Sequence, residues 1–140
     1  MNILKQRSAG ILLHVTSLPG PYGIGDLGPS AFHFVDWLVS AKQSIWQLLP
    51  TTPIGPGNSP YQSVSAFAGS PLMVALEPLI EAGWLETPAL PQEKFDAHQV
   101  HFGQVIPWRI DQLRKAAAGF FARATTAQKQ NFADWKKQQA

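Results

Sequence analysis

The chain has 140 residues, of which 45% are hydrophobic and 14% are charged, so it can bury the core of one ordinary domain and does not have a disordered composition. Lys and Arg together number 11 against 9 Asp and Glu, and the scattered charges argue against nucleic acid or a membrane as a partner. The absence of cysteine excludes disulfides and thiolate chemistry and is consistent with a cytoplasmic protein.

The first third of the chain predicts a strand, a helix and a second strand. Ala9 to Val15 is a short continuous apolar run, typical of a buried parallel strand, and Ile45 to Leu49 is a second one. Between them, Ser30 to Ala41 has helical spacing, and Pro29 suits the first turn. The apolar positions of that helix are Ala31, Phe34, Val35, Leu38 and Val39. This order indicates a βαβ unit with parallel strands, and thus an α/β fold.

A long polar loop follows the second strand. From Gly55 to Pro71 it combines three prolines and three glycines with hydroxyl and amide residues and only two aromatics, Tyr61 and Phe67. Proline restricts the backbone, so we expect a rigid loop. A tyrosine among hydrogen-bonding groups suits a flat polyhydroxylated ligand, whose apolar face the ring can cover. The alternative from the same residues is an ordered structural loop in which Tyr61 is half-buried.

The middle of the chain has weaker signals. Leu72 to Leu76 is predicted to be a short strand, and Pro78 to Ala82 a helical turn that Gly83 ends. Residues 86–106 contain two prolines and mixed side chains, so we expect an irregular segment.

Two helices are predicted at the end of the chain. Pro107 can open a helix that runs to Ala124. Its expected apolar stripe comprises Ile110, Leu113, Ala117, Phe120, Phe121 and Ala124. Thr125 and Gln128 have the spacing of a capping box for a final helix, which would place Phe132 and Trp135 on one side.

Two further motifs could indicate a dinucleotide site and a metal site, but their sequence context does not fit these functions. Gly23-Ile-Gly25-Asp-Leu-Gly28 matches the dinucleotide-binding pattern, but the strand ends too far upstream and no acid follows the second strand, so we expect an ordinary loop. His98 and His101 have no third ligand nearby, so we predict no metal site.

The polar loop is part of a wider resemblance. Ser59-Pro-Tyr-Gln-Ser63 and Ser65-Ala-Phe-Ala-Gly69 resemble the signature of the 4-alpha-glucanotransferases called amylomaltases or disproportionating enzymes, glycoside hydrolase family 77. Further agreement comes from Gly10-Ile-Leu-Leu-His14, the segment from Thr16 to Gly28, and Trp46-Gln-Leu-Leu-Pro50. The similarity runs from about residue 8 to the end of the chain. Ser70 and Ala75 depart from it, since the family usually has asparagine and an acidic residue there.

This resemblance implies a (β/α)8 TIM barrel, which needs about 250 residues when complete. We therefore expect the N-terminal portion of an incomplete barrel with a helical insertion. Residues 1–85 would form the first two βα units with a glucan-binding loop at 50–71. Residues 86–140 would form an irregular segment and a truncated helical subdomain.

The implied function is that of a fragment of a 4-alpha-glucanotransferase of maltose and glycogen metabolism, with maltooligosaccharides or other α-1,4-glucans as partners. Such an enzyme transfers α-1,4-glucan segments by a retaining double displacement and uses no cofactor. The nucleophile, the acid/base and the stabilising carboxylate are expected downstream, so this chain would contain no catalytic residue and be inactive alone. The alternative is a natural non-catalytic short protein, either a glucan-binding or a helical interaction module.

The resemblance also implies that Tyr61 and Ser59 bind substrate. Weaker substrate-binding candidates are Asn58, Gln62, Asp26 and His14, together with Tyr22 and Trp46. Simpler roles compete for some of them: Asp26 is expected to hydrogen bond within its own loop, and Trp46 to lie in the core. A lone histidine in an apolar run, such as His14, is more often a structural group.

Overall fold

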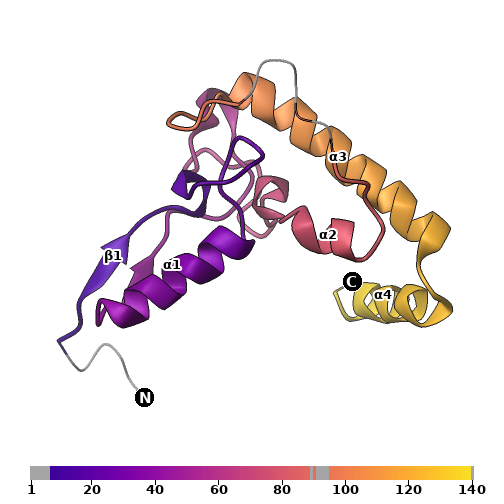
Figure 1. Cartoon of the computed structure of the whole chain (residues 1–140), viewed down its shortest axis with the longest axis horizontal. Helices are drawn as coiled ribbons and strands as arrows, with labels where there is room; N and C mark the ends of the chain where they lie inside the picture. The colour runs from indigo at the N-terminus through magenta and orange to yellow at the C-terminus, as the bar shows by residue number, and fades with distance from the viewer. Residues whose placement is uncertain (1–6, 89, 91–94, 140) are drawn as a thin grey trace.

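The structure is a computed structural model that describes residues 7–88, 90 and 95–139. Its elements are strand β1 (Gly10–Leu12), helix α1 (Pro29–Ser40), strand β2 (Ile45–Gln47) and the helices α2 (Glu77–Glu81), α3 (Phe102–Arg123) and α4 (Thr126–Gln138). The strands and α1 lie at one end of the molecule, α3 and α4 lie at the other, and loops fill the centre (Figure 1).

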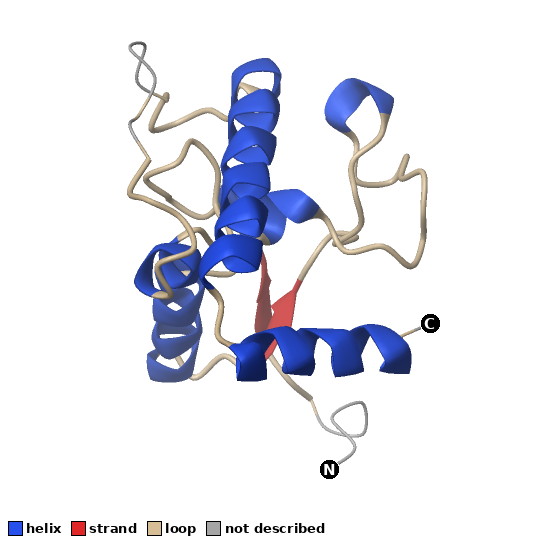
Figure 2. Ribbon diagram, turned by 90° about the vertical axis from the view of Figure 1, so that its right-hand side faces the viewer, coloured by secondary structure: helices blue, strands red, loops and turns tan. Residues whose placement is uncertain are grey.

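The predicted βαβ unit is confirmed. β1 and β2 pair in parallel, with Gly10 opposite Ile45, and α1 connects them. Gly10 is required at this position because a Cβ would lie 2.4 Å from the carbonyl oxygen of Ile45. The described residues therefore form an α/β fold with a two-stranded sheet, which Figure 2 shows at the centre of a structure made mostly of helices and loops.

The expectation that these strands are buried is wrong for this chain. Leu12 is 57% exposed and Ile45 is 37% exposed. Only two strands pair within the described residues, and the helix contact on the sheet comes from Phe34, whose ring meets Trp46 edge-on at 5.0 Å. Trp46 is half-buried, and its Nε1 donates a hydrogen bond to the Leu13 carbonyl oxygen at 2.7 Å. Trp46 therefore packs against α1 and the end of β1, and the expectation that it lies in the core is confirmed only in part.

The predicted apolar face of α1 is confirmed only in part. The helix begins with Pro29 in its first turn, as expected, and Ala31 and Leu38 are buried. Val35 and Val39 remain exposed because nothing among the described residues covers their side of the helix.

The predicted strand at 72–76 is wrong. Pro71–Met73 forms a 3-10 turn closed by a hydrogen bond from the Met73 N–H to the Ser70 carbonyl. The apolar run is nevertheless buried, with Leu72 and Leu76 both in the core, because its side chains enter the interior from a turn. The helical turn that follows is confirmed as α2, and Gly83 ends it with a φ of 71°.

Helix α3 begins five residues before the predicted start, with Pro107 inside it. The earlier turn is stabilised because Val105 enters a core cluster with Ile24 and Leu72. Residues 95–101 are irregular as expected, whereas 89 and 91–94 lie outside the described residues.

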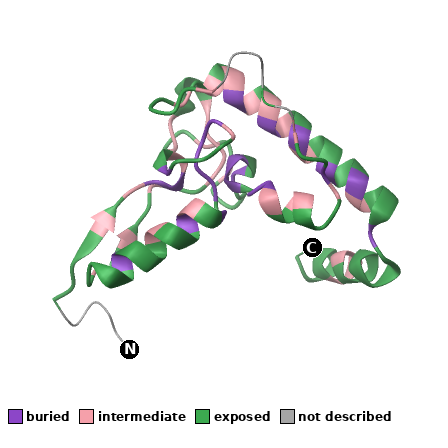
Figure 3. Cartoon of the chain, viewed as in Figure 1, coloured by how far each residue is buried: buried purple, intermediate pink, exposed green. Residues whose placement is uncertain are grey.

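The buried face of α3 is also offset from the predicted apolar stripe. Figure 3 shows buried residues at regular intervals along this helix. They are Val105, Arg109, Gln112, Ala116 and Gly119, which are mostly small or polar. Leu113 is half-buried and Phe121 is 62% exposed, so the large apolar residues lie beside the buried face.

The capping box that opens α4 is confirmed: the Thr125 hydroxyl accepts from the Gln128 N–H at 3.2 Å, and the Gln128 side chain accepts from the Thr125 N–H at 2.8 Å. Phe132 and Trp135 lie on one side, with stacked rings 6.1 Å apart. None of the helices in the described ranges is long and apolar enough to cross a membrane.

Candidate functional site

The loop between β2 and α2 is closed at its base. The Ser70 N–H donates to the Thr51 carbonyl oxygen at 3.0 Å, which joins the two ends of the segment that we call the Tyr61 loop (residues 51–70). Within it, Gly55 lies so close to Gln62 that a Cβ would be 1.7 Å from the Gln62 carbonyl oxygen. The two ends of this long loop are therefore held together, and its first half folds back on itself where Gly55 meets Gln62.

Serine hydroxyls fix the tip of this loop. The Ser59 hydroxyl accepts from the Tyr61 N–H at 3.3 Å, and the Ser65 hydroxyl accepts from the Phe67 and Ala68 N–H groups at 3.3 and 3.2 Å. The serine hydroxyls thus accept from backbone N–H groups that would otherwise be paired within a helix or a sheet. Ser59 still has its own hydroxyl proton, so it can donate to a ligand.

The Tyr61 ring projects from the loop. Tyr61 is 72% exposed, so the half-buried position that the structural alternative expects for this residue is wrong. Asn58, Ser59 and Gln62 lie beside it in sequence, and Asn58 adopts a left-handed φ of 60° after Gly57 at 76°. An exposed ring with amide and hydroxyl neighbours is the arrangement that stacking on a sugar requires.

A small cavity lies at the carboxyl ends of both strands. It has a volume of about 200 Å³, and half of its lining residues are polar, namely His14, Thr16, Ser17, Thr52, Asn58 and Ser70. The other half is apolar and comprises Leu49, Ile54, Pro60, Leu72, Met73 and Phe102. Parallel strands end at the same edge of the sheet, which is why a residue after β1 meets residues after β2. The structure thus brings His14 and Asn58 together. Ser59, Tyr61 and Gln62 lie outside this lining: Ser59 is half-buried, and Tyr61 and Gln62 are exposed.

His14 is the buried polar group of this cavity. It is 8% exposed, and its Nδ1 has no hydrogen-bond partner in the part of the chain that the structure describes. Burial lowers the pKa of the His14 imidazole below its ordinary value. The ring is therefore neutral at pH 7 and has a nitrogen available to a ligand or water in the cavity.

Asp26 has a different environment. It is buried, its Oδ1 accepts from the Gly28 N–H at 3.0 Å, and its Oδ2 accepts from Arg109 at 2.9 Å. Burial raises the pKa of the Asp26 carboxyl and the nearby Glu77 adds to this, whereas Arg109 and the Gly28 N–H oppose the shift. Both oxygens of Asp26 thus bind groups of the protein.

Arg109 itself was missed by sequence reasoning. Its partner Asp26 is 83 positions away in the chain. The available signal was its place in a series with Val105, Gln112 and Ala116 at helical spacing, in which an arginine stands on the buried face.

Tyr22 was also named as a weak ligand-binding candidate. Its ring stacks on Trp108, with centroids 5.7 Å apart and planes 25° from parallel. This contact occupies one face of the ring, so Tyr22 packs on α3 from the loop after β1, and its role in ligand binding stays a prediction.

The Asp and Glu side chains of the described residues do not provide a pair of carboxyl groups for cleaving a glycosidic bond at this cavity. Among the described residues that line it there is no Asp or Glu, whereas cleavage by a retaining enzyme needs two carboxyl groups about 5 to 5.5 Å apart across the bond. Asp26 and Glu77 do influence one another, but Asp26 is committed to Arg109. The described residues also contain no group of three His, Cys, Asp or Glu that could hold a metal ion.

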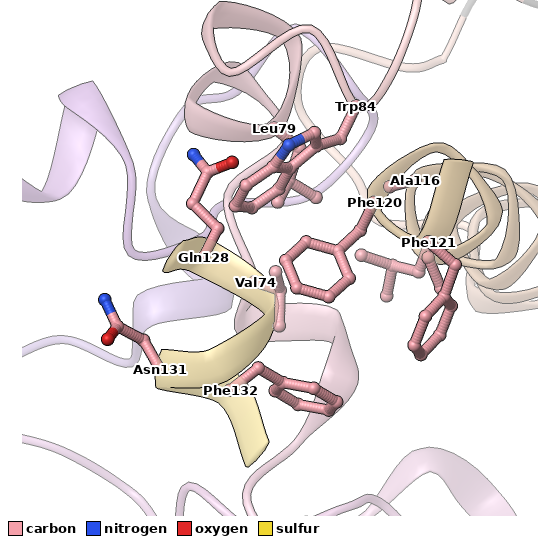
Figure 4. Close-up of a pocket in the computed structure, with 11 residues that line it drawn as sticks. Val74, Leu79, Trp84, Ala116, Phe120, Phe121, Gln128, Asn131 and Phe132 are labelled. Atoms are coloured by element: carbon pink, nitrogen blue, oxygen red, sulfur yellow. The ribbon is translucent and has the colours of Figure 1, made fainter. Parts of the chain in front are cut away.

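A second cavity lies between α2, α3 and α4. It has a volume of about 540 Å³ and is lined mainly by aromatic and aliphatic side chains, with Gln128 and Asn131 on α4 as its polar residues (Figure 4). The Trp84 and Phe120 rings meet edge-on at 4.9 Å beside it. It contains no titratable group and few hydrogen-bonding groups, so it does not suit a polyhydroxylated ligand.

Comparison with known proteins gives a consistent result. Residues 13–140 match the family model described as 4-alpha-glucanotransferase. The chain is 43% identical over 136 residues to the 4-alpha-glucanotransferase of Thermus thermophilus, which covers 96% of this chain and 26% of that protein. It is 47% identical over 116 residues to the chloroplastic/amyloplastic enzyme of Solanum tuberosum, covering 80% of this chain and 20% of that protein.

A solved structure agrees with these relatives. The amylomaltase from Streptococcus agalactiae in complex with acarbose superposes with a TM-score of 0.79 at 34% sequence identity, over 94% of this chain and 27% of that chain. The present chain thus spans about a quarter of the length of the proteins that it matches.

Proposed function

The chain belongs to the 4-alpha-glucanotransferase family, and from this premise we propose that it supplies part of the glucan-binding surface of an enzyme that acts on α-1,4-glucans. The observation that supports this most directly is Tyr61, which is 72% exposed on a closed loop whose residues Asn58 and Pro60 line the cavity with His14. The solved amylomaltase, whose matching region has the same fold, is a complex with acarbose.

The proposal gives each candidate residue a role. The Tyr61 ring packs on a glucose ring, and the Ser59 hydroxyl donates a hydrogen bond at its edge. The Asn58 and Gln62 amides provide further polar contacts, and the neutral His14 ring lies at the buried side of the cavity. Asp26 contributes indirectly, since its oxygens hold its own loop and Arg109.

The wider reaction follows from the family. A retaining transferase forms a covalent glycosyl-enzyme with one carboxylate, while a second carboxyl group first protonates the leaving oxygen and then deprotonates the acceptor hydroxyl. The acceptor here would be another maltooligosaccharide, as maltose and glycogen metabolism require. In this chain the described residues around the cavity bind and orient the glucan, and they supply neither carboxyl group.

The barrel and the division of the chain are also proposals. β1 and β2 would be neighbouring strands of a (β/α)8 barrel, with residues 1–85 in the barrel and 86–140 in a helical subdomain. The parallel pairing of β1 with β2 supports the first part. The cytoplasm is the proposed compartment because the chain has no cysteine.

The binding role is tested by titrating the chain with maltoheptaose while following backbone amide shifts of the Tyr61 loop. Replacing the ring, Tyr61→Ala, should weaken affinity by about 1 to 3 kcal/mol, since it removes the stacking surface. Tyr61→Phe keeps that surface and should lose much less.

Phe67→Ala is the matched control. Phe67 is an aromatic residue of the same loop and is 100% exposed, but it is flanked by Ala66 and Ala68 rather than by polar groups. Its removal should leave maltoheptaose affinity unchanged. Unperturbed amides throughout the titration, or equal affinity for the wild type and Tyr61→Ala, would contradict the proposal.

The catalytic part of the proposal is tested separately. The 140-residue chain should produce no glucose and no longer oligomers from maltotriose, as followed by chromatography, because its cavity lacks the carboxyl pair. Turnover of maltotriose by the chain alone would show that the catalytic groups have been wrongly placed outside it.

A further inference from the structure

Arg109 occupies an unusual position on α3. Its side chain is fully buried, and its Nη2 donates to Asp26 Oδ2 at 2.9 Å and to the Val74 carbonyl oxygen at 2.5 Å. One guanidinium nitrogen therefore joins three segments of the chain that are far apart in sequence.

The two acceptors lie where the two loops of the candidate site return to the core. Asp26 is near the end of the loop between β1 and α1, and Val74 follows the Tyr61 loop. The two segments are also joined directly, since the Leu27 N–H donates to the Met73 carbonyl oxygen at 3.0 Å. Arg109 thus contacts both loops at their junction.

Hydrogen bonds continue from this junction to the walls of the cavity. On one side, the Met73 N–H donates to the Ser70 carbonyl at 3.1 Å, and the Ser70 N–H donates to the Thr51 carbonyl at 3.0 Å. On the other side, Gly25, next to Asp26, donates its N–H to the Thr16 carbonyl at 3.3 Å. Ser70 and Thr16 both line the cavity.

Stability alone does not account for this arginine. In the part of the chain that the structure describes, its Nε and Nη1 are buried without hydrogen-bond partners, as is Glu77 Oε2. Unpaired buried donors are costly, and a well-packed apolar residue in place of a buried ion pair is often neutral or stabilising. What the guanidinium provides instead is a pair of N–H donors in fixed directions, which hold the Asp26 carboxylate and the Val74 carbonyl in place.

We propose that Arg109 is a positioning residue of the glucan site: it holds the ends of the β1–α1 loop and the Tyr61 loop on α3, and so fixes the cavity between them. This inference rests on the proposed glucan-binding function for its ligand. It assigns Arg109 no contact with the sugar.

The test compares the wild type with the double variant Asp26→Asn/Arg109→Met. Arg109→Met alone would leave a charged carboxylate buried without its partner, whereas the double variant removes both charges and keeps an oxygen for the Gly28 N–H. We expect the double variant to melt cooperatively, within about 5 °C of the wild-type temperature, because the loss of the Val74 hydrogen bond offsets the removal of the buried charges. We also expect its maltoheptaose affinity to fall by about tenfold and hydrogen exchange at the Ser70 and Gly28 amides to quicken by a similar factor.

Arg123→Met is the matched control on the same helix. Arg123 also holds a loop, since it donates to the Gly83 and Trp84 carbonyl oxygens at 2.6 and 2.8 Å, but that loop lies outside the candidate site. This variant should lower the melting temperature and leave both affinity and exchange at Ser70 unchanged. A conservative Arg109→Lys change should restore part of the affinity, because it keeps the charge beside Asp26 but not the planar fork.

A double variant with wild-type affinity and wild-type exchange at Ser70 and Gly28 would overturn the positioning role. If the wild type itself does not bind maltoheptaose, the proposed function fails, and amide exchange still decides whether Arg109 positions the loops. If the double variant gives no cooperative melt, Arg109→Lys tests the positioning role instead. Wild-type maltoheptaose affinity and wild-type amide exchange at Ser70 and Gly28 in that variant would overturn the role.

Discussion

Replacing Gly119 with alanine should destabilise the protein, although the same change in most helices does the opposite. In an ordinary helix interior, alanine is favoured over glycine by about 1 kcal/mol. Here a Cβ on Gly119 would lie 1.8 Å from the Trp84 carbonyl oxygen and 2.6 Å from the Arg123 guanidinium. Backbone atoms of the segment after α2 would have to move by more than 1 Å.

The expected magnitude follows from what this movement disturbs. Overpacking a core site costs about 1 to 3 kcal/mol, and displacing Trp84 weakens the two hydrogen bonds from Arg123, each worth about 1 kcal/mol. Leu85, which is 5% exposed in the adjacent core cluster, would move with them. Against the gain of about 1 kcal/mol from helix propensity, the net loss should be about 2 kcal/mol.

Urea unfolding followed by circular dichroism at 222 nm measures this loss. Gly103→Ala on the same helix is the control, since no atom lies within 4 Å of its added Cβ and its backbone is not strained. That variant should be as stable as the wild type or more stable by up to about 1 kcal/mol. If Gly119→Ala is also neutral or stabilising, the close packing of the Trp84 segment on α3 is not maintained in solution.

Three further changes have definite expected outcomes. Lowering the pH from 7 to 5 should reduce the urea midpoint of the wild type more than that of His14→Gln, because unfolding lets the buried His14 regain its ordinary pKa of 6.5 and take up a proton. A parallel pH dependence of the two proteins would contradict this. Gly57→Ala should cost about 1 to 2 kcal/mol at a φ of 76°, while Gly69→Ala, with open space and ordinary φ, should be neutral in the same unfolding assay. Thr125→Ala should cost α4 about 1 kcal/mol, seen as faster amide exchange in its first turn, and unchanged exchange there would argue against the cap.

Local signals predicted the parts of the fold that local physics determines. The helix with Pro29 in its first turn, the turn ended by Gly83 and the Thr125 cap each depend on a few neighbouring residues. The prediction of a strand at 72–76 was wrong because a short apolar segment is compatible with either a strand or a buried turn, and Pro71 favoured the turn. Pro107 misled in a similar way, since the preceding residues gained enough burial to extend α3 past it.

The candidate site also has features that the local sequence predicts and features that depend on long-range packing. The meeting of His14 and Asn58 at one cavity follows from parallel strands that end at the same edge of the sheet. The Asp26–Arg109 pair joins residues 83 positions apart and depends on how α3 crosses the loops. No pattern within one element reports such a crossing, so the pairing of Arg109 with Asp26 became visible only in the folded chain.

Exposure alone does not distinguish a ligand-binding aromatic from other exposed apolar groups of this chain. Phe67 is more exposed than Tyr61, and Leu12 and Ile45 on the sheet are also accessible. A sugar ring offers an apolar face surrounded by hydroxyls, so its partner must be an aromatic ring with hydrogen-bonding groups at its edge. Among these four, Tyr61 has Asn58, Ser59 and Gln62 beside it in sequence, whereas Phe67 stands between two alanines and the nearby Ser65 hydroxyl is engaged by backbone N–H groups. The chemistry of the neighbours is therefore what favours Tyr61 over Phe67 for the proposed sugar-binding role.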